Sequence, residues 1–387
     1  MFADFGCDSI LSVMLNRKSF SILVSIMVLV ASANGPALAL QSKDKKDEKK
    51  KPEPFKIEKH TQGMGLYMLG PLSPDKKTIL LIAKKPDSPP NLYRMDLADY
   101  SIQTLTQFPW GVSDPQWSPD GAAVAFAGFN ESASFSDIYT LDLKKIAMRR
   151  LTSNNFSDKQ PVFAPDGKRI YFTTDESPLP DAAFGILHVA VVQAAGGKSE
   201  FFTEDEVSSI LPSLGADGNS LMLVKVDELS GRHSLWQYNL DGKPLRDLTE
   251  RKFARIHRYI PIAARGLIVI WGQEEPEQQD GVYILDAKSR DVRAVPDVDL
   301  PKRSPAVSPD GTLVAYVAQT ATGAHLFLFD SKTGQVQQLT TQGFLNFSPA
   351  FISDDRILFG SNRVTNENEI YSLNLSSPVK DEKKEKK

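Results

Sequence analysis

The stretch Pro115-Gln116-Trp117-Ser118-Pro119-Asp120-Gly121 decides the fold, because the tight turn at its end recurs along the chain. Proline fixes the first central φ of such a turn, and glycine takes the left-handed position that strains a residue with a Cβ. Clear copies occupy 164–167 and 308–311, and weaker ones contain Asp75, Asp217, Arg265 and Asp354. The third positions of the seven turns (75, 120, 166, 217, 265, 310 and 354) are 44 to 51 residues apart. A period of this size indicates an array of identical supersecondary units.

Each unit contains four strand-like runs around its turn. The first run carries a proline a few residues before the turn, and the second is apolar, as in Val124-Ala125-Phe126. The third alternates, as in Ile138-Tyr139-Thr140-Leu141, and the fourth ends in an apolar-Thr pair such as Leu151-Thr152. Short runs rich in aromatic and β-branched residues, separated by Gly, Pro, Asp and Asn, are typical of antiparallel strands.

Four strands in about 45 residues match one blade of a β-propeller. The sequence therefore predicts an all-β fold, a seven-bladed β-propeller with four-stranded antiparallel blades; a β-sandwich is the alternative. The seventh unit stops after its third strand, at Leu375, and residues 55–61 alternate and end in Thr like the other fourth strands. We expect this N-terminal strand to complete the last blade and so to remove an exposed sheet edge.

The repeat resembles that of TolB-type propellers in its turn motif at 115–121, in Ile138-Tyr139-Thr140-Leu141-Asp142 and in Leu151-Thr152. The resemblance covers roughly residues 55–376 and implies the propeller fold. Such blades occur in periplasmic binding and scaffolding proteins and as the gating domain of prolyl-oligopeptidase-like enzymes. The chain departs from TolB in having seven repeats where TolB has six, and in lacking room for an α/β domain before the propeller. The resemblance to TolB therefore does not imply that this chain binds the Tol–Pal system.

The N-terminal region predicts export. Arg17 and Lys18 precede an apolar run over 20–30, and Ala37-Leu38-Ala39 has the form of a cleavage site. The predicted organisation is a signal peptide over 1–39 with Met14 as an alternative start, a charged linker over 40–54, the propeller over 55–376 and a charged tail over 377–387. An uncleaved anchor is the alternative, but the apolar run is short for a membrane span. We expect a periplasmic or secreted monomer without a membrane span after cleavage.

Charge and cysteine content restrict the classes of function. The net charge is −3, from 45 basic and 48 acidic residues, which argues against a nucleic-acid partner. The only cysteine, Cys7, lies within the predicted signal, so no disulfide or thiolate chemistry is expected in the mature protein.

Catalytic motifs are absent from the sequence. It contains no Gly-x-Ser-x-Gly pentapeptide, and its five histidines have no metal-ligand spacing. We therefore predict no catalytic residue, no cofactor and no metal, and we interpret the turn aspartates as turn formers.

The residues that precede each first strand are the candidate binding site, since the first strands of a propeller surround its channel. Cations come from the later blades and carboxylates from the second and third, so one mouth of the channel carries a polarised ring. The predicted mouth residues are Asp114, Asp158, Lys159, His257, Arg258, Lys302, Arg303 and Asn346.

Three functions remain open from the sequence. The leading hypothesis is a non-enzymatic exported propeller that binds a protein or peptide at this mouth, as part of a cell-envelope complex. The second is a binding protein for an anionic small ligand or glycan. The third is a hydrolase or lyase that uses channel carboxylates such as Asp114 and Asp158.

Overall fold

The computed structural model describes residues 53–85, 87–178, 185–296, 300–364 and 367–379. The predicted signal peptide, most of the charged linker and the end of the charged tail lie outside these residues. No helix in the described part of the chain is long and apolar enough to cross a membrane.

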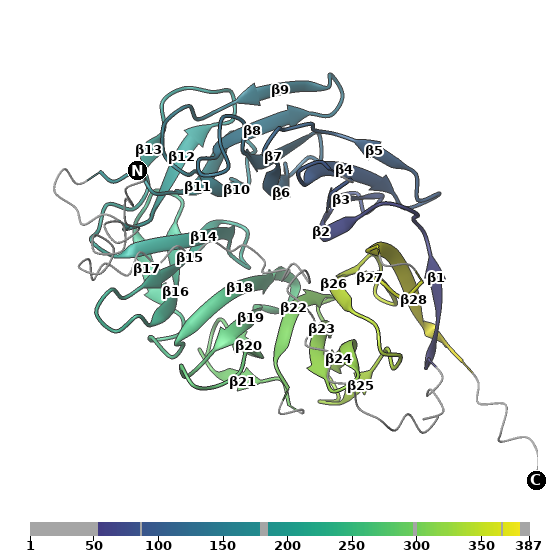
Figure 1. Cartoon of the computed structure of the whole chain (residues 1–387). Helices are drawn as coiled ribbons and strands as arrows, with labels where there is room; N and C mark the ends of the chain where they lie inside the picture. Colours follow the sequence, from purple (N-terminus) through teal and green to yellow (C-terminus); the bar gives the residue numbers. More distant parts are fainter. Residues whose placement is uncertain (1–52, 86, 179–184, 297–299, 365–366, 380–387) are drawn as a thin grey trace, which may run out of the picture.

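Seven four-stranded antiparallel sheets form a ring, so the predicted seven-bladed propeller is confirmed (Figure 1). In every blade the first strand lies at the channel and the fourth at the rim. Blade 1 contains β2 (Leu66–Leu72), β3 (Thr78–Ala83), β4 (Asn91–Asp96) and β5 (Ile102–Thr104); blade 2 contains β6 (Val112–Trp117), β7 (Ala123–Gly128), β8 (Asp137–Asp142) and β9 (Ala147–Arg150); blade 3 contains β10 (Lys159–Phe163), β11 (Arg169–Thr174), β12 (His188–Gln193) and β13 (Glu200–Phe201). Blade 4 contains β14 (Ser208–Leu214), β15 (Ser220–Val226), β16 (His233–Asn239) and β17 (Pro244–Asp247); blade 5 contains β18 (Arg255–Ile262), β19 (Leu267–Gln273), β20 (Gly281–Asp286) and β21 (Val292–Ala294); blade 6 contains β22 (Lys302–Val307), β23 (Leu313–Thr320), β24 (Gly323–Asp330) and β25 (Val336–Gln338); blade 7 contains β26 (Asn346–Phe351), β27 (Arg356–Ser361), β28 (Glu369–Pro378) and β1 (Phe55–Lys59).

The recurring turn joins the first two strands of a blade and is held by its own side chains. Ser118 Oγ donates to Asp120 Oδ1 at 2.6 Å, and Ala123 N donates to Ser118 Oγ at 2.9 Å. Gly121 has φ +70°, the left-handed conformation that the turn requires. The aspartates of these turns are therefore turn formers. We call the face of the ring that carries the turns the turn face, and the opposite face, where the first strands begin, the mouth face.

A threonine at the end of the fourth strand ties that strand to the third. Thr152 Oγ1 accepts a hydrogen bond from Ile138 N at 2.9 Å, and Thr106 accepts one from Leu92 N in the same way. In blade 7 the corresponding threonine is Thr61, which accepts from Ile370 N at 2.9 Å. The N-terminal segment thus reproduces the interaction that the other blades make within one repeat.

The closing strand β1 pairs antiparallel with β28, with Ile57 opposite Leu373 and Lys59 opposite Tyr371. The predicted closure is confirmed. β28 extends to Pro378, beyond the expected end at Leu375, because Phe55 pairs with Pro378. Val379 N donates to Pro54 O at 2.9 Å, so the two ends of the described propeller lie side by side.

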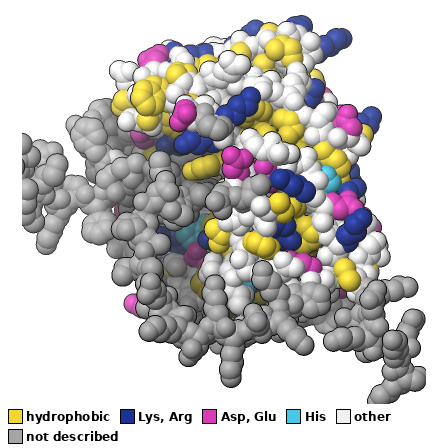
Figure 2. Space-filling view, turned by 45° about the vertical axis from the view of Figure 1, so that its right-hand side comes forward, with side chains coloured by type: hydrophobic (Ala, Val, Ile, Leu, Met, Phe, Trp, Pro, Cys, Tyr) yellow, Lys and Arg dark blue, Asp and Glu magenta, His cyan; other side chains and the backbone are white. Residues whose placement is uncertain are grey.

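The core lies between blades. The central strands are buried on both faces, as in β3, which explains the continuous apolar second runs. Each apolar cluster joins neighbouring blades; one, for example, combines Met222 and Leu248 of blade 4 with Ile268 of blade 5. On the visible surface, basic and acidic side chains are interspersed (Figure 2), as expected from the near-balanced net charge.

Candidate functional site: the channel

A β-bulge interrupts the first strand of most blades next to its proline. In β6 the pairing with β7 shifts between Ser113 and Gln116, so Asp114 and Pro115 face a single partner residue. In five blades the residue before the proline has a left-handed backbone, with φ between 47° and 56°; these residues are Asp114, Gln160, Leu211, Ser304 and Ser348. Left-handed backbone is uncommon away from glycine, and five equivalent instances indicate a constraint common to the blades.

These bulge residues connect neighbouring blades around the channel. Gln160 Oε1 accepts a hydrogen bond from Leu211 N at 3.0 Å, between blades 3 and 4. Ser348 Oγ accepts one from Leu69 N at 2.9 Å, between blades 7 and 1. Asp114 in turn accepts a hydrogen bond from the backbone of Gln160. The wall of the channel is thus held by polar side chains that satisfy backbone donors.

Asp114 is the carboxylate of the channel. Burial raises the pKa of Asp114, although Ser113, the Gln160 backbone, Lys159 and Arg258 all act to lower it. The Ser113 hydroxyl donates to Asp114 Oδ2 at 2.8 Å. Water reaches part of this side chain, but protein surrounds it on the sides of the channel. Desolvation by the channel walls therefore raises the pKa of Asp114 by more than the nearby positive charges lower it.

Arg258 of blade 5 faces Asp114 of blade 2 across the channel. Desolvation lowers the pKa of Arg258, and the charge of Asp114 partly offsets this effect. The arginine is solvent-exposed all the same. Arg303 of blade 6 is also exposed, and desolvation lowers its pKa as well. Both guanidinium groups remain charged at neutral pH.

Lys159 of blade 3 is a further positive charge close to Asp114. Its Nζ lies 5.8 Å from the centroid of the Phe129 ring, and its charge acts on Asp114. The structure therefore brings together Asp114, Lys159 and Arg258 of the predicted mouth residues. We call these three residues the channel cluster.

Three other predicted residues lie inside the wall. Asp158, Lys302 and Asn346 are buried. Asn346 Nδ2 donates to Ala324 O at 2.7 Å, and Arg363 donates to Asn346 Oδ1 at 2.9 Å. These side chains support the fold between blades and do not line the channel.

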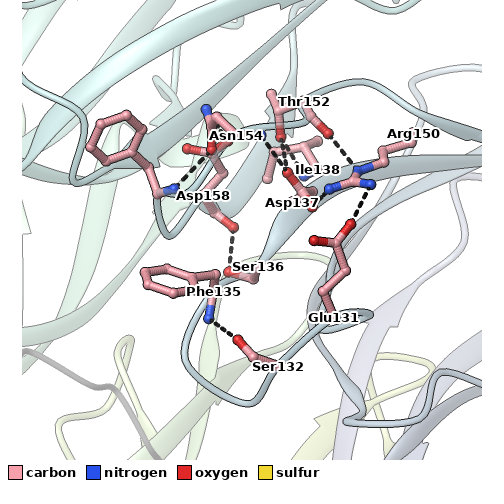
Figure 3. Close-up of polar contacts among 11 residues, drawn as sticks. Glu131, Ser132, Phe135, Ser136, Asp137, Ile138, Arg150, Thr152, Asn154 and Asp158 are labelled. Atoms are coloured by element: carbon pink, nitrogen blue, oxygen red, sulfur yellow. Dashed lines mark hydrogen bonds and ion pairs between the residues drawn. The ribbon is translucent and has the colours of Figure 1, made fainter.

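Asp158 belongs to a polar contact between blades 2 and 3 (Figure 3). Its backbone carbonyl accepts a hydrogen bond from Ser136 Oγ at 2.8 Å, and Asn154 Nδ2 lies 3.4 Å from its carboxylate. Burial raises the pKa of Asp158 to about 6, and the hydroxyls of Thr174 and Thr152 act in the opposite direction. The group is therefore a pH-sensitive element of the wall.

The His257 side chain contacts residues of its own blade, blade 5. Its Nε2 lies 2.9 Å from Asp280 Oδ1, and its ring centroid lies 4.7 Å from that of Trp271. Together with Asp280 it supplies two potential metal ligands. The described residues contain no group of three or more His, Cys, Asp or Glu side chains that could hold a metal ion.

Gln160 was missed by the sequence interpretation, and Ser113, two residues before its proline, was not included in the predicted set of mouth residues. Ser113 and Gln160 both bond to the channel carboxylate or to the wall around it. The signal that could have found Gln160 is its position directly before a first-strand proline, which it shares with Asp114.

Comparisons with known proteins agree with this architecture. A family model described as TolB beta propeller domain matches residues 56–299. No curated protein matches the chain in sequence. Among solved structures, the oligogalacturonate lyase of Vibrio parahaemolyticus is 15% identical, with a TM-score of 0.62, over 83% of this chain and 93% of that one. TolB from Acinetobacter baumannii is 20% identical, with a TM-score of 0.50, over 69% of this chain and 64% of that one.

Peptidases are also similar over their propellers. The acylaminoacyl peptidase of Pyrococcus horikoshii is 17% identical, with a TM-score of 0.60, over 82% of this chain and 52% of that one. At these identities the likeness concerns the fold. The hypothesis of a non-enzymatic propeller that binds a protein or peptide is nevertheless wrong on this comparison, because similar propellers belong to a lyase, to acylaminoacyl peptidase and to prolyl endopeptidase.

Proposed function

Since the chain belongs to the TolB β-propeller domain family, whose fold alone does not specify an activity, we propose a function from the chemistry of the channel. The protein is proposed to be a hydrolase or lyase that binds an anionic substrate at the channel mouth and transfers a proton through Asp114. The observation that carries this proposal is the raised pKa of Asp114 in a channel that also contains Lys159 and Arg258.

Proton transfer requires a group whose pKa lies near the working pH. An ordinary aspartate is too weak a base and too rarely protonated to serve well at neutral pH. Desolvation in the channel raises the pKa of Asp114, which is the direction that proton transfer at neutral pH requires. The Ser113 hydroxyl donates to Asp114 Oδ2 at 2.8 Å and the Gln160 backbone also donates to this carboxylate, so its orientation in the channel is fixed.

Substrate binding is assigned to the cations. Arg258 is exposed and interacts with Asp114, and Arg303 is exposed on the first strand of the next blade. Both present planar guanidinium groups, which match a carboxylate in two-point contacts. An oligomer of uronic acids suits this arrangement because it carries one carboxylate on each sugar. Two of the similar solved structures are oligogalacturonate lyases, which supports this substrate class.

A lyase reaction follows directly from these roles. The Asp114 carboxylate accepts a proton from the carbon next to the substrate carboxylate, while the arginines stabilise the negative charge that develops there. The C–O bond to the leaving sugar breaks, a C=C bond forms, and the leaving oxygen takes a proton from solvent water, while the proton on Asp114 returns to the solvent. One of the similar lyases is described in complex with manganese; the described residues of this chain do not fit such a site, and no step proposed here uses a metal.

The test is turnover of defined acidic oligosaccharides, beginning with oligogalacturonate. Elimination is followed by ultraviolet absorbance of the new C=C bond, and hydrolysis by new reducing ends. Asp114→Asn should reduce turnover by about 100-fold or more with little change in binding. Arg258→Gln should weaken binding by about tenfold, as expected for the loss of one charged hydrogen bond.

The matched control is Asp241→Asn, in an exposed loop. It should behave as the unmodified protein. Unchanged turnover in Asp114→Asn would contradict the catalytic role of Asp114. If the unmodified protein binds these oligosaccharides without turning them over, it is a binding protein and not an enzyme for them.

Export remains part of the proposal, since the sequence before the linker has the features of a secretory signal. Expression of the full chain in a bacterial host, followed by N-terminal sequencing of the periplasmic protein, should give a chain that begins near residue 40. Retention of the intact chain in the membrane fraction would favour an uncleaved anchor.

A further inference from the structure

Exposed aromatic side chains gather on the mouth face beside blade 2. Trp110 is 54% exposed, Phe135 48% and Phe156 37%, and no other Phe, Trp or Tyr side chain of the described residues is exposed. Trp110 lies in the loop before β6, Phe135 in the loop before β8 and Phe156 in the loop before β10. Exposed apolar side chains that gather in one place indicate a binding surface.

Trp110 is joined to the channel cluster through Phe129. Trp110 N donates a hydrogen bond to Phe129 O at 3.2 Å, and Phe129 N donates to Gly111 O at 3.0 Å. The Phe129 ring is half-buried, and Lys159 of the channel cluster lies over it, with 5.8 Å between Nζ and the ring centroid. The aromatic surface is therefore continuous with the channel cluster.

Phe135 and Phe156 lie at the contact between blades 2 and 3. Ser136 Oγ lies 3.4 Å from Ser157 Oγ, so the aromatic residues directly before these two serines are neighbours. The backbone N of each aromatic residue donates to a side-chain oxygen of its own loop, at 3.2 Å for Phe135 and 3.1 Å for Phe156. In Figure 3 the Phe135 ring points away from the ion pairs of Arg150. We call Trp110, Phe129, Phe135 and Phe156 the aromatic patch.

The charges beside the aromatic patch disfavour an anion. Glu131 pairs with Arg150 at 2.9 Å, Arg150 pairs with Asp137 at 2.6 Å, and the exposed Asp175 accepts a backbone hydrogen bond from the loop before β10 at 2.6 Å. These carboxylates outnumber the cations even when the lysine of the channel cluster is counted. Arg150 already lies between two of the acids, which disfavours a second cation there. Glu131 and Asp175 keep free lone pairs that can accept hydrogen bonds from hydroxyl groups.

We propose that the aromatic patch binds neutral sugar units, and that the substrate is a mixed oligosaccharide with neutral sugars next to the uronic acid held at the channel mouth. One face of a hexose ring carries mainly C–H groups, which pack favourably on the electron-rich face of an aromatic ring. The hydroxyls at the edge of the sugar can donate to Glu131 and Asp175. The mixed substrate rests on the proposed function, whereas the binding of neutral sugars does not.

The test uses cellotetraose, a neutral β-1,4-linked glucose oligomer, with affinity measured by ligand-observed NMR on the full chain. Trp110→Ala and Phe156→Ala should each weaken its binding by about tenfold, because a stacking ring is lost. Trp110→Phe and Phe156→Tyr keep a ring and should bind about as tightly as the unmodified protein. All these side chains are exposed, so the substitutions leave the core intact.

The matched control is Leu345→Ala, which removes an exposed apolar side chain directly before the first strand of blade 7. It should bind cellotetraose as the unmodified protein does, and so should Asp114→Asn in the channel. Three results would overturn the patch: no binding of cellotetraose, an affinity that stays the same in both alanine variants of the patch, or an equal loss in Leu345→Ala. Tighter binding of tetramethylammonium than of cellotetraose would also overturn it, by assigning the rings to a cation.

The mixed substrate is tested by turnover of two matched β-1,4-linked oligosaccharides, one of glucuronate alone and one that alternates glucose with glucuronate. The alternating oligosaccharide should have the higher kcat/KM, and Trp110→Ala should raise its KM by about tenfold with little change in kcat. Preference for the uniform oligosaccharide, or an unchanged KM in Trp110→Ala, would overturn the mixed substrate. If neither is turned over while cellotetraose still binds at the patch, the enzymatic function is contradicted and the sugar-binding patch is supported.

Discussion

Thr61 donates a hydrogen bond from its Oγ1 to Glu369 Oε2 at 2.5 Å, although 308 residues separate the two in the sequence. Glu369 is fully buried and also accepts from Gly63 N at 2.5 Å. One carboxylate therefore fastens the end of the closing strand to the blade that it completes. Closure of the ring depends on this contact as well as on the pairing of β1 with β28.

Replacement of Glu369 by alanine should weaken closure. Two donors of the N-terminal segment then lose a buried, charged acceptor, which costs about 1.5–3 kcal/mol for each hydrogen bond. The free energy of unfolding in urea should fall by about 3–6 kcal/mol, with Glu277→Ala, at an exposed position, as the control. An unchanged midpoint would mean that strand pairing alone closes the ring.

Asp158→Asn should stabilise the protein at neutral pH. Burial raises the pKa of Asp158 in the folded protein to about 6, from an ordinary value of 3.8. The protonated form is therefore favoured by folding, so its contribution is present below pH 3.8 and is lost as the pH rises through 6. The difference amounts to at most about 3 kcal/mol at pH 7.

Thermal unfolding at pH 4 and pH 7.5 checks this prediction. Asn346 occupies the same position in blade 7, which shows that the wall accepts an amide there. The melting temperature of Asp158→Asn should exceed that of the unmodified protein at pH 7.5, and the two should approach each other at pH 4. A difference independent of pH would exclude ionisation as its cause; Asp241→Asn serves as the control.

Gln160→Ala should loosen the channel wall. Gln160 Oε1 accepts hydrogen bonds from Leu211 N and from Thr173 Oγ1 at 2.9 Å, and alanine leaves both donors without this acceptor. We expect a loss of about 1–3 kcal/mol in the free energy of unfolding. Gln335→Ala, in an exposed turn, should have no effect, and an equal loss in both variants would contradict the role of Gln160.

Arg258→Gln should move the titration of Asp114 to higher pH. The arginine charge lowers the pKa of Asp114, so its removal leaves desolvation less opposed. Carbon-13 NMR of the aspartate carboxyl should report the shift directly. The acidic limb of the pH–turnover profile, which depends on the ionised Asp114 carboxylate as the base, should move in the same direction. A titration of Asp114 that does not move would place the two groups beyond electrostatic reach.

The fold could be predicted from the sequence because each blade repeats a turn whose geometry needs particular residues. Even the closing strand could be identified, since Thr61 stands where the other fourth strands carry threonine. The side chains of the channel were harder to predict. The alternation of side chains along a strand shows which face of the sheet each residue is on only while the strand pairing is regular. The bulges interrupt this pairing in the first strands.

The position of each bulge explains which mouth residues line the channel. Asp158, Lys302 and Asn346 lie three residues before their prolines and point into the wall. Arg258 also lies three residues before its proline, yet it faces the channel, because the bulge of blade 5 falls between Ile256 and Arg258. No residue type in the sequence marks this displacement, so the sequence could not show which of the eight predicted residues turn into the wall.

The meeting of the two ends of the described propeller, at Pro54 and Val379, has a practical consequence for engineering. The ring of blades is interrupted only between these two neighbouring ends, and a short linker could join them. New ends could then be cut elsewhere, for instance at the exposed loop around Leu229, to give a circular permutant with the same ring. In such a molecule the seventh blade would become an ordinary blade, and the closing contact would move to whichever blade carries the new cut.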